Sequence, residues 1–339
     1  MEPIHGFLVF VWIAFLGLFL TLYVLLDGFD LGIGILSLFV RVEERRGIMM
    51  ASLSGVWDAN ETWLVVLGGA LFGAFPLAYA VILHGLYLPI VTMIFALAFR
   101  GVAFEFREHA RHHRRWMRAF GIGSLIAAIC QGLALGGLIG GLAVRNGEFA
   151  GGAFAWLSPF SIVAAAGVVF GYVLLGSTFL IIKTEGEYQE HHRRHAWVAG
   201  ALMLAVAFVI SVWTPIRYPF VAREWFGGGF FHPLDLAPLV GAIAALMLAR
   251  SLRNRYEYAP FWWTTVIFIA SLSGLAAALY PYLVPPSLTA GEAAADTFTL
   301  TFMLLGIGML TPIMIAYNAY QYLVFRGKVP TGGYGADED

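Results

Sequence analysis

Charged residues are scarce in this chain, and that scarcity excludes most classes of soluble protein. Of its 339 residues, 12% are charged and 60% are hydrophobic, whereas a soluble globular protein carries roughly 25% charged residues. The net charge of −1 gives no reason to expect nucleic-acid binding. The composition therefore predicts an all-α polytopic membrane protein, whose helices satisfy their own backbone hydrogen bonds in lipid.

Cysteine and helix-borne histidine are also nearly absent. Cys130 is the single cysteine, so we expect no disulfide framework. Six of the nine histidines fall in basic segments, which we expect to be solvated faces near anionic lipid rather than metal sites. Only His84 falls within an expected helix, and a haem held between helices needs two inward-facing ligands. We therefore expect no haem bound by this chain alone; His84 paired with a methionine is the alternative.

Nine apolar segments are candidate spanning helices, each of which needs about 20 mostly apolar residues. They are residues 7–27, 54–75, 79–99, 120–143, 159–182, 197–213, 236–250, 261–281 and 297–325. The first has no basic leading segment and is too long for a cleaved signal peptide. No loop is long enough to fold separately, so we expect one membrane domain over 1–328 and a disordered cytoplasmic tail over 329–339.

The basic residues predict how the chain is oriented. Seventeen of the 20 lysines and arginines lie in alternate segments, namely 41–46, 100–118, 183–194, 250–255 and 326–328. The other side holds Arg145, Arg217 and Arg223. Cytoplasmic loops carry the excess of basic residues. The pattern therefore predicts a cytoplasmic C-terminus and, with nine spans, an N-terminus on the outside.

Two pairs of carboxylates interrupt the apolar segments. Asp27 and Asp30 lie near the predicted cytoplasmic end of the first span, and Asp58 and Glu61 begin the second. The members of each pair are three residues apart, so they share a helix face. A carboxylate at membrane depth is costly unless it is paired, protonated or hydrated, so these acids indicate a functional site.

Arg100 and Glu105 close the third span at the same end. We therefore expect all these acids to form one cluster that opens toward the cytoplasm. Such an arrangement suits a proton relay, in which each group must accept and release a proton. The alternative is structural: the acids cap helix ends and pair with Arg100 or Arg107.

Residues beside the acids are expected to position them. Gly28 and Gly32 form a small-xxx-small step, which allows close helix packing or, alternatively, local unwinding as at transporter ion sites. Trp57 and Trp63 flank Asp58. These two indoles are either interfacial anchors or N–H donors to the Asp58 carboxylate.

Four segments together resemble subunit II of the cytochrome bd-type quinol oxidases. They are GFDLG (28–32), WDAN (57–60), RGVAFEFR (100–107) and KTEGE (183–187), and the likeness runs over about residues 5–328. The resemblance implies two four-helix bundles and a peripheral helix in a bacterial or archaeal cytoplasmic membrane. It also implies a similarly folded subunit I that carries haem b, haem d and the quinol site.

The resemblance implies that this haem-free subunit supports subunit I and conducts cytoplasmic protons to the site of O2 reduction. It makes Asp58 the relay residue nearest the partner's haems. The candidate relay residues are Asp58, Asp30, Asp27, Glu105, Arg100 and Glu61, and those expected to pack or orient them are Trp57, Asn60, Gly28 and Gly32. Some members of the family also hold a quinone in this subunit, and the resemblance leaves room for a small accessory subunit.

The sequence departs from the family pattern at two positions, and two other functions stay open. The family's usual WDGN is WDAN here, so Ala59 adds a methyl group, and Glu61 stands at a variable position. A proton- or cation-coupled secondary transporter could be built around a broken first helix at Asp27 and Asp30. A purely structural subunit is the other alternative, in which Asp58 only holds an arginine or a haem propionate of the partner.

Overall fold

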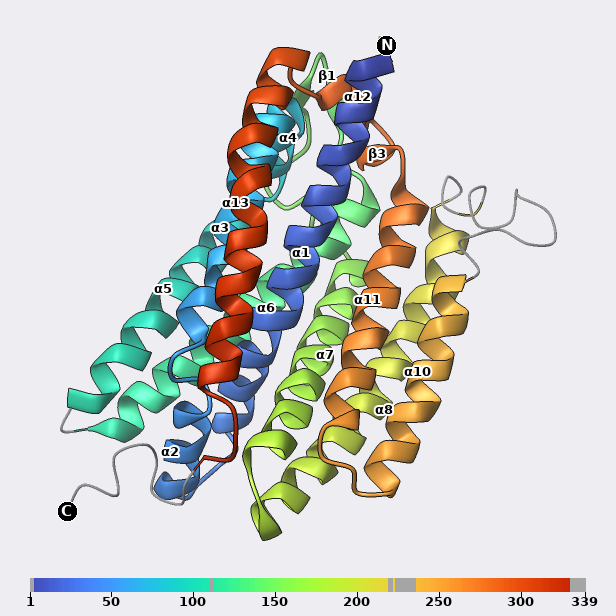
Figure 1. Ribbon diagram of the computed structural model, residues 1–339. Helices are drawn as coiled ribbons and strands as arrows, with labels where there is room; N and C mark the ends of the chain where they lie inside the picture. The colour runs from blue at the N-terminus through green and yellow to red at the C-terminus, as the bar shows by residue number, and fades with distance from the viewer. Residues whose placement is uncertain (1–2, 110–111, 219–221, 223–235, 330–339) are drawn as a thin grey trace.

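The computed structural model describes residues 3–109, 112–218, 222 and 236–329, which are helical almost throughout (Figure 1). The helices are α1 (Pro3–Ser37), α2 (Glu43–Ala51), α3 (Trp57–Ala74), α4 (Pro76–Gly85), α5 (Tyr87–His109), α6 (His113–Gly140), α7 (Pro159–Lys183), α8 (Gly186–Arg217), α10 (Leu236–Arg253), α11 (Ala259–Leu279), α12 (Ala290–Ala293) and α13 (Thr297–Val324). Strand β1 (Val144–Arg145) pairs antiparallel with β2 (Glu148–Phe149), and β3 (Tyr282–Val284) with β4 (Leu288–Thr289). Of the predicted disordered tail, residues 330–339 lie outside the described residues.

The long apolar helices of the described residues account for eight of the nine predicted spans. Eight helices are long and apolar enough to cross a membrane, namely α1, α5, α6, α7, α8, α10, α11 and α13. Helix α3, followed directly by α4, lies where the span 54–75 was predicted (Figure 1). The all-α membrane fold is therefore confirmed. The expected span 79–99 is wrong in its bounds, because Pro76 begins the separate helix α4 and the next long helix starts at Tyr87.

The long helices form two bundles, and α13 lies outside them (Figure 1). Helix α1 packs with α3 and α6, and α6 packs with α5, which gives the first bundle. The second contains α7, α8, α10 and α11, and α7 joins it to α1 and α6. Helix α13 contacts α3 and α1 and leaves most of its apolar side chains exposed, Phe298 by 79%. It is therefore the peripheral helix.

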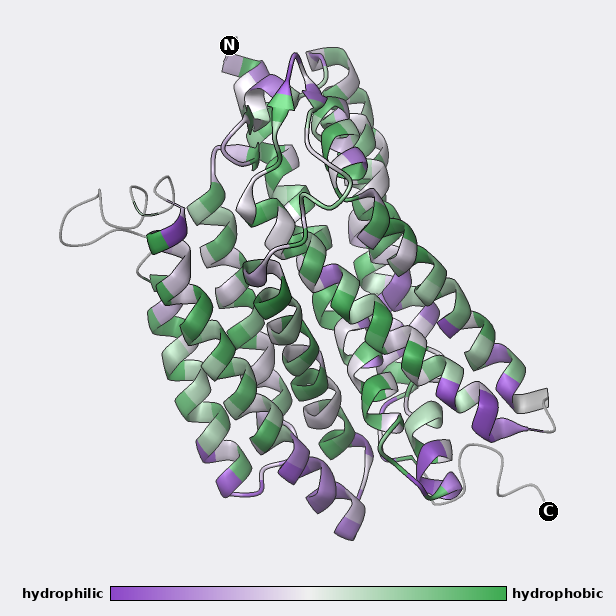
Figure 2. Cartoon of the chain, turned by 180° about the vertical axis from the view of Figure 1, so that it is seen from behind, coloured by the Kyte–Doolittle hydropathy of each residue, from purple (hydrophilic) through white to green (hydrophobic). Residues whose placement is uncertain are grey.

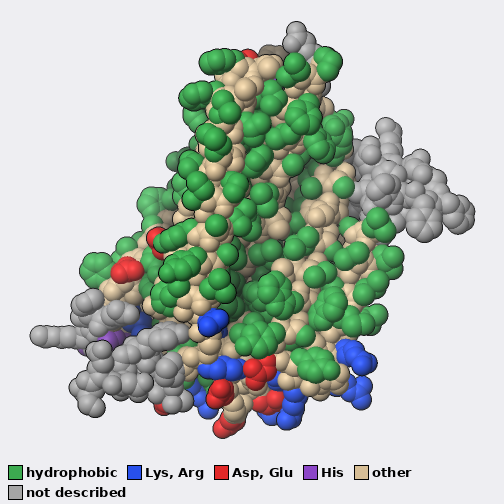
Figure 3. Space-filling model, in the orientation of Figure 1, with side chains coloured by type: hydrophobic (Ala, Val, Ile, Leu, Met, Phe, Trp, Pro, Cys, Tyr) green, Lys and Arg blue, Asp and Glu red, His purple; other side chains and the backbone are tan. Residues whose placement is uncertain are grey.

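Charged side chains concentrate at one end of the molecule. Figure 2 shows hydrophobic residues along the helices and hydrophilic ones at the end where α2 lies, and Figure 3 shows lysines, arginines and acids gathered there. Lys328 Nζ lies 2.8 Å from Glu257 Oε2 at this end, and Val329 N donates to Lys183 O at 2.9 Å. We call it the basic end: α2 and residues 112–118, 183–194, 250–258 and 325–329.

Glycines on α1 allow a close approach of α7. A Cβ at Gly28 would lie 2.8 Å from Tyr172 Cε1, and one at Gly32 would overlap the Tyr172 carbonyl group. The predicted close packing is therefore confirmed. Local unwinding is not seen, since α1 continues without a break from Pro3 to Ser37. The uninterrupted helix carries both of its aspartates on the side that faces its neighbours.

Candidate functional site

Arg100 lies at the centre of a buried charged cluster between α1, α3 and α5. Its Nη2 is 2.6 Å from Asp27 Oδ1 and 2.9 Å from Glu61 Oε1. The side chains of Arg100 and Asp27 are 1% and 0% exposed, whereas that of Glu61 is 26% exposed. One cation therefore holds two carboxylates from different helices, and one of these carboxylates reaches the surface.

Asp30 follows Asp27 by one helical turn, and its partner is uncharged. Asn60 Nδ2 donates to Asp30 Oδ2 at 2.9 Å, and Tyr322 Oη of α13 donates to Asn60 Oδ1 at 2.8 Å. Asp30 and Asn60 are fully buried. Asp30 Oδ1 has no hydrogen-bond partner among the described residues. We call Asp27, Asp30, Glu61 and Arg100 the acid cluster; it contains three carboxyl groups and one guanidinium.

The acid cluster lies inside the bundle rather than at its basic surface. Asp27 is ten residues before the end of α1 at Ser37, and Arg100 is nine residues before the end of α5 at His109. At 1.5 Å per residue, these separations are about 15 Å and about 14 Å along the helix axes. The acids of α1 therefore lie well within the long helices, on the side of the basic end.

Asp58 and Glu105 lie outside the buried cluster. Both side chains are exposed on the surface of this chain, and no ion pair of either is found among the described residues. The expectation that all these acids form one cluster is therefore wrong for Asp58 and Glu105. Helix α3 begins at Trp57, so its first turn directs Asp58 outward, whereas Asn60 and Glu61 reach α1 and α5. A carboxylate in this first turn is also favoured by the helix dipole.

Only some of the candidate acids pair with an arginine, as the structural alternative expected for all of them. Asp27 and Glu61 pair with Arg100, as the structural alternative expected. Arg107 instead lies 3.4 Å from Glu43 of α2. Glu61, at the variable position, is therefore one of the two acids in direct contact with the central arginine.

The tryptophans beside Asp58 have other partners. Trp63 Nε1 donates to Asn318 Oδ1 of α13 at 2.7 Å, and the Trp57 ring packs on Phe104 with centroids 5.1 Å apart. The alternative in which Trp63 donates to Asp58 is therefore wrong. Because α13 lies against α3, the Trp63 indole serves to fix the peripheral helix.

Four buried or partly buried polar residues near the cluster were not predicted. Tyr322 reaches Asn60 from α13, and Tyr23, Gln131 and Tyr172 are linked to one another by hydrogen bonds next to Asp27. The sequence carried two signals for them. Tyr23 precedes Asp27 by four residues and so shares its helix face, and Gln131 is an amide within an apolar segment.

Among the described residues, the histidines occupy positions that differ in part from those predicted. His84 is exposed on α4, with its ring 5.4 Å from that of Phe149, so it does not fit an axial ligand inside the bundle. His192 is fully buried against Tyr188, so its predicted solvated position is wrong; α8 is helical there and turns it inward. His232 and the side chain of His109 lie outside the described residues.

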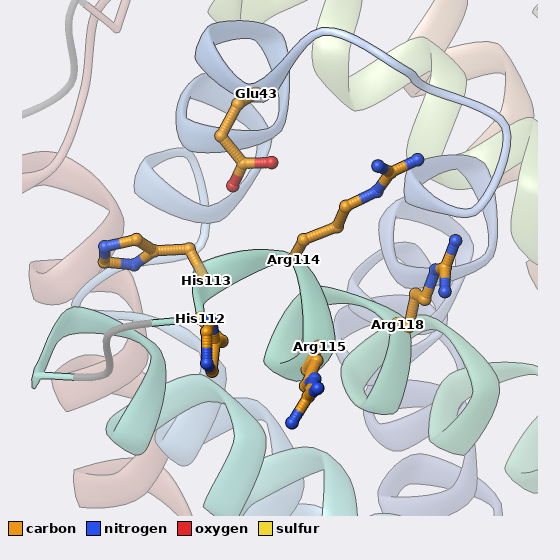
Figure 4. Close-up of a pocket in the computed structure, with 6 residues that line it drawn as sticks. All are labelled: Glu43, His112, His113, Arg114, Arg115 and Arg118. Atoms are coloured by element: carbon orange, nitrogen blue, oxygen red, sulfur yellow. The ribbon is translucent and has the colours of Figure 1, made fainter.

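A separate hollow of about 470 Å³ lies at the basic end (Figure 4). It is lined by Glu43 of α2 and by His112, His113, Arg114, Arg115 and Arg118 around the start of α6. The first turn of α6 has no acidic residue, so its positive dipole end adds to the arginine charges. The hollow contains no member of the acid cluster and suits an anion.

Comparisons with known proteins agree with this fold. The family model for cytochrome bd terminal oxidase subunit II matches residues 8–325. Cytochrome bd-I ubiquinol oxidase subunit 2 of Escherichia coli K12 is 28% identical, over 94% of both chains, and cytochrome bd ubiquinol oxidase subunit 2 of Bacillus subtilis is 27% identical, over 97% of this chain and 98% of that one. A chain of the bd oxidase from Geobacillus thermodenitrificans has the same fold, with a TM-score of 0.77 at 20% identity over 94% of this chain and 98% of its own. The chain therefore belongs to the cytochrome bd terminal oxidase subunit II family.

Proposed function

We propose that this chain, which its family makes a subunit of a quinol oxidase, conducts cytoplasmic protons toward a haem-bearing subunit I. The observation that carries the proposal is the Arg100 cluster, in which buried Asp27 and partly exposed Glu61 share one guanidinium. Haems b and d of subunit I would supply electrons and bind O2. The part of this chain is to hold and move the protons.

The charge of the acid cluster supports proton binding. The acid cluster contains three carboxyl groups and one guanidinium, so it has two more negative than positive charges when every group is ionised, and bound protons can balance this excess. Asp30 has only an amide as its partner. Asp30 Oδ1 and Arg100 Nη1 have no partner among the described residues, so each can bind a water molecule that carries a proton.

The exposed acid Asp58 would pass protons to the partner. Asp58 lies one turn before Glu61 on α3. Val65, two turns after Asp58, is 75% exposed. A carboxylate beside an apolar surface at membrane depth is stable only where a partner or water solvates it. We therefore place subunit I against this side of α3, with Asp58 between Glu61 and the partner.

The proposed direction of proton movement follows from the basic residues. The basic end would face the cytoplasm by the positive-inside rule, which puts the N-terminus outside and the C-terminus inside. The cluster would then be reached from the cytoplasm. Glu105 lies on α5, five residues beyond Arg100 toward the basic end and exposed, and it would act at the entrance.

The other proposed partners bind away from the acid cluster. The basic hollow at the start of α6 would contact the headgroup of an anionic lipid (Figure 4). Phe106 and Trp116, stacked with ring centroids 5.6 Å apart on α5 and α6, would lie at the level of the membrane interface. A quinone bound in this subunit and a small accessory subunit stay predictions of the family likeness.

One preparation tests the proposal against the transporter alternative. The tagged chain is purified in mild detergent and its reduced-minus-oxidised spectrum is recorded. We expect b- and d-type haem bands with a co-purifying second subunit. A haem-free preparation that carries ion flux in liposomes would contradict the proposal and support a secondary transporter.

Asp58→Asn then tests whether that carboxylate carries protons. We expect slower quinol oxidation with unchanged haem content. Normal turnover with normal haems would remove Asp58 from the path. Loss of the haems would instead support the structural alternative, in which Asp58 only holds a group of the partner.

A further inference from the structure

The peripheral helix α13 reaches the acid cluster through one tyrosine. Tyr322 Oη donates to Asn60 Oδ1 at 2.8 Å, and Asn60 Nδ2 donates to Asp30 Oδ2 at 2.9 Å. Both bonds join side chains, and Asn60 and Asp30 are fully buried. Helices α13, α3 and α1 thus meet in one row of hydrogen bonds, which ends on a carboxyl oxygen of the acid cluster.

A second hydrogen bond fixes α13 against α3 one turn away. Trp63 Nε1 donates to Asn318 Oδ1 at 2.7 Å. Asn60 and Trp63 are three residues apart on α3, so they share a helix face. Asn318 and Tyr322 are four residues apart on α13 and share a face for the same reason. Two bonds between the same two faces determine the rotation of α13, and therefore where the Tyr322 hydroxyl lies.

The end of α13 is held by a buried lysine of the KTEGE segment. Lys183 is 7% exposed, and its Nζ donates at 2.6 Å to the carbonyl oxygen of Phe325, the residue that caps α13. A cation at this end of a helix is also favoured by the helix dipole. The Tyr322 ring meets the Phe29 ring edge-on, with centroids 6.4 Å apart. The last turn of α13 is therefore fixed along its axis as well as in rotation.

The row of hydrogen bonds holds Asp30 without conducting protons itself. The Asn60 amide does not titrate, so no proton passes through it from Tyr322 to Asp30. A carboxyl group accepts from an amide both with and without its proton, so the bond to Oδ2 persists while Asp30 gains and loses a proton. Asp30 Oδ1 has no hydrogen-bond partner among the described residues. It is the oxygen left open to a proton.

We propose that Tyr322 is a positioning residue of the acid cluster: through Asn60 it holds Asp30 Oδ2 and leaves Asp30 Oδ1 to exchange protons. A proton adds to Oδ1 and leaves from Oδ1, and in the protonated form Oδ2 is the carbonyl oxygen that accepts from Asn60. This inference rests on the proposed proton-conducting role of the acid cluster. It gives α13 a part in that role.

Loss of the Tyr322 hydroxyl would reach Asp30 by a defined route. Without it, Asn60 Oδ1 is a buried acceptor with no donor, which is costly. The amide then turns about its last side-chain bond toward another donor, and its N–H leaves Asp30 Oδ2. Phenylalanine at this position keeps the ring contact with Phe29, so the hydroxyl is the only group removed.

Infrared difference spectroscopy of the purified two-subunit oxidase, labelled with ¹³C-aspartate, tests the inference. Spectra are recorded across a pH step, and the carbonyl band of protonated Asp30 is the one that Asp30→Asn removes. A carbonyl group that loses a hydrogen bond absorbs at higher wavenumber. We expect Asn60→Ala to move the Asp30 band to higher wavenumber and Tyr322→Phe to move it in the same direction by less.

Proton uptake during a single turnover gives the functional readout. Tyr322→Phe should slow it about two- to tenfold with unchanged haem spectra, which is the effect of one weakened hydrogen bond. In an Asp30→Asn background, Tyr322→Phe should leave the remaining rate unchanged, because it acts through Asp30.

Two controls separate the hydroxyl from the packing of α13. Tyr320→Phe removes a hydroxyl from a side chain of the same helix that is 63% exposed, and it should leave both readouts unchanged. Trp63→Phe breaks the other hydrogen bond between α3 and α13 and keeps the row to Asp30, so the Asp30 band should stay in place.

Four results would overturn the inference. They are an Asp30 band that stays at the wild-type position in Asn60→Ala and Tyr322→Phe, an equal shift in Trp63→Phe, an equal slowing by Tyr322→Phe in the Asp30→Asn background, and a spectrum with no band that Asp30→Asn removes. The band reports Asp30 without turnover, so a shift stands even if the chain proves not to conduct protons. That failure would appear instead as proton uptake at the wild-type rate in Glu61→Gln.

Discussion

Removal of the central cation should destabilise the folded protein by an amount that depends on pH. Arg100→Gln leaves Asp27 fully buried without its 2.6 Å partner, whereas Glu61, 26% exposed, can still reach solvent. Loss of one partner from a buried ion pair costs about 3–5 kcal/mol. The stranded carboxylate can escape this cost by taking up a proton.

The cost of that protonation sets the expected pH dependence. An aspartate in water titrates near 3.9, so protonation costs about 4 kcal/mol at pH 7 and about 1.5 kcal/mol at pH 5. The free energy of unfolding of Arg100→Gln should therefore be lower than that of wild type by about 3–4 kcal/mol at pH 7 and by about 1.5 kcal/mol at pH 5. Arg100→Gln/Asp27→Asn should recover most of it at pH 7, since an amide needs no counter-ion.

The assay is the unfolding of the detergent-purified complex between pH 5 and 8, with wild type measured at each pH. Tm shifts give the direction of each effect, and unfolding by a denaturing detergent gives the free-energy differences. A deficit that does not change with pH would refute the reasoning. So would a double variant that is as unstable as Arg100→Gln, because the loss would then come from packing and not from an unpaired charge.

Three further predictions concern packing, the basic end and the peripheral helix. Gly32→Ala should destabilise the α1–α7 contact by at least about 1 kcal/mol, because its Cβ would overlap the backbone of α7, whereas Gly17→Ala, which meets nothing within 4 Å, should not; equal Tm values for the two would contradict this. The pKa of Glu257 is lowered by hydrogen bonds from Lys328 and Gln189, so the stabilisation from the Lys328 pair should be present above pH 4.5 and be lost as pH falls below it. Both side chains are partly exposed, so Lys328→Met should cost under about 1 kcal/mol at pH 7 and less at pH 3, because Glu257 takes up a proton while Thr184 O still accepts from Lys328; an equal cost at both pH values would argue against the pair. Trp63→Phe should destabilise the packing of α13 on α3 by about 1–3 kcal/mol, because it leaves Asn318 Oδ1 without a donor. The measurement is faster proteolysis after α13; an unchanged cleavage rate would show that Trp63 does not hold this helix.

The spans could be predicted from the sequence because hydropathy and basic-residue placement are local signals. The polar break before α3 and the apolar runs on either side fix its approximate place without any tertiary contact. The boundary at Tyr87 could not be predicted in the same way. Residues 76–99 form one apolar stretch, and the division into α4 and α5 depends on the turn after Gly85.

Helix phase explains why Asp58 does not join Glu61 in the acid cluster, as the sequence had led us to expect. The i, i+3 spacing predicts that Asp58 and Glu61 share a face, and it fixes no direction for the centre of that face. Packing of α3 against α1 and α5 turns Asn60 toward Asp30 and Glu61 toward Arg100. The same packing leaves Asp58 on the surface. That rotation is a tertiary property, so no pattern within α3 could reveal it.

Long-range partners were beyond a pattern-based prediction for a different reason. Tyr322 meets Asn60 across 262 residues of sequence. Its helix is apolar on nearly all sides, so no hydrophobic face indicates which residues of α13 turn toward α3. The Tyr23 phenol, by contrast, lay one turn from Asp27 on the same helix and could have been inferred.

The rate of proton uptake during a single turnover tests the central claim most directly. The reduced two-subunit oxidase is mixed with O2 in weak buffer containing a pH indicator, and wild type is compared with Glu61→Gln and with Glu187→Gln, an exposed acid in the first turn of α8. We predict that Glu61→Gln slows proton uptake at least about tenfold with unchanged haem spectra, and that Glu187→Gln matches wild type. Proton uptake at the wild-type rate in Glu61→Gln would contradict the conduction of protons through the Arg100 cluster.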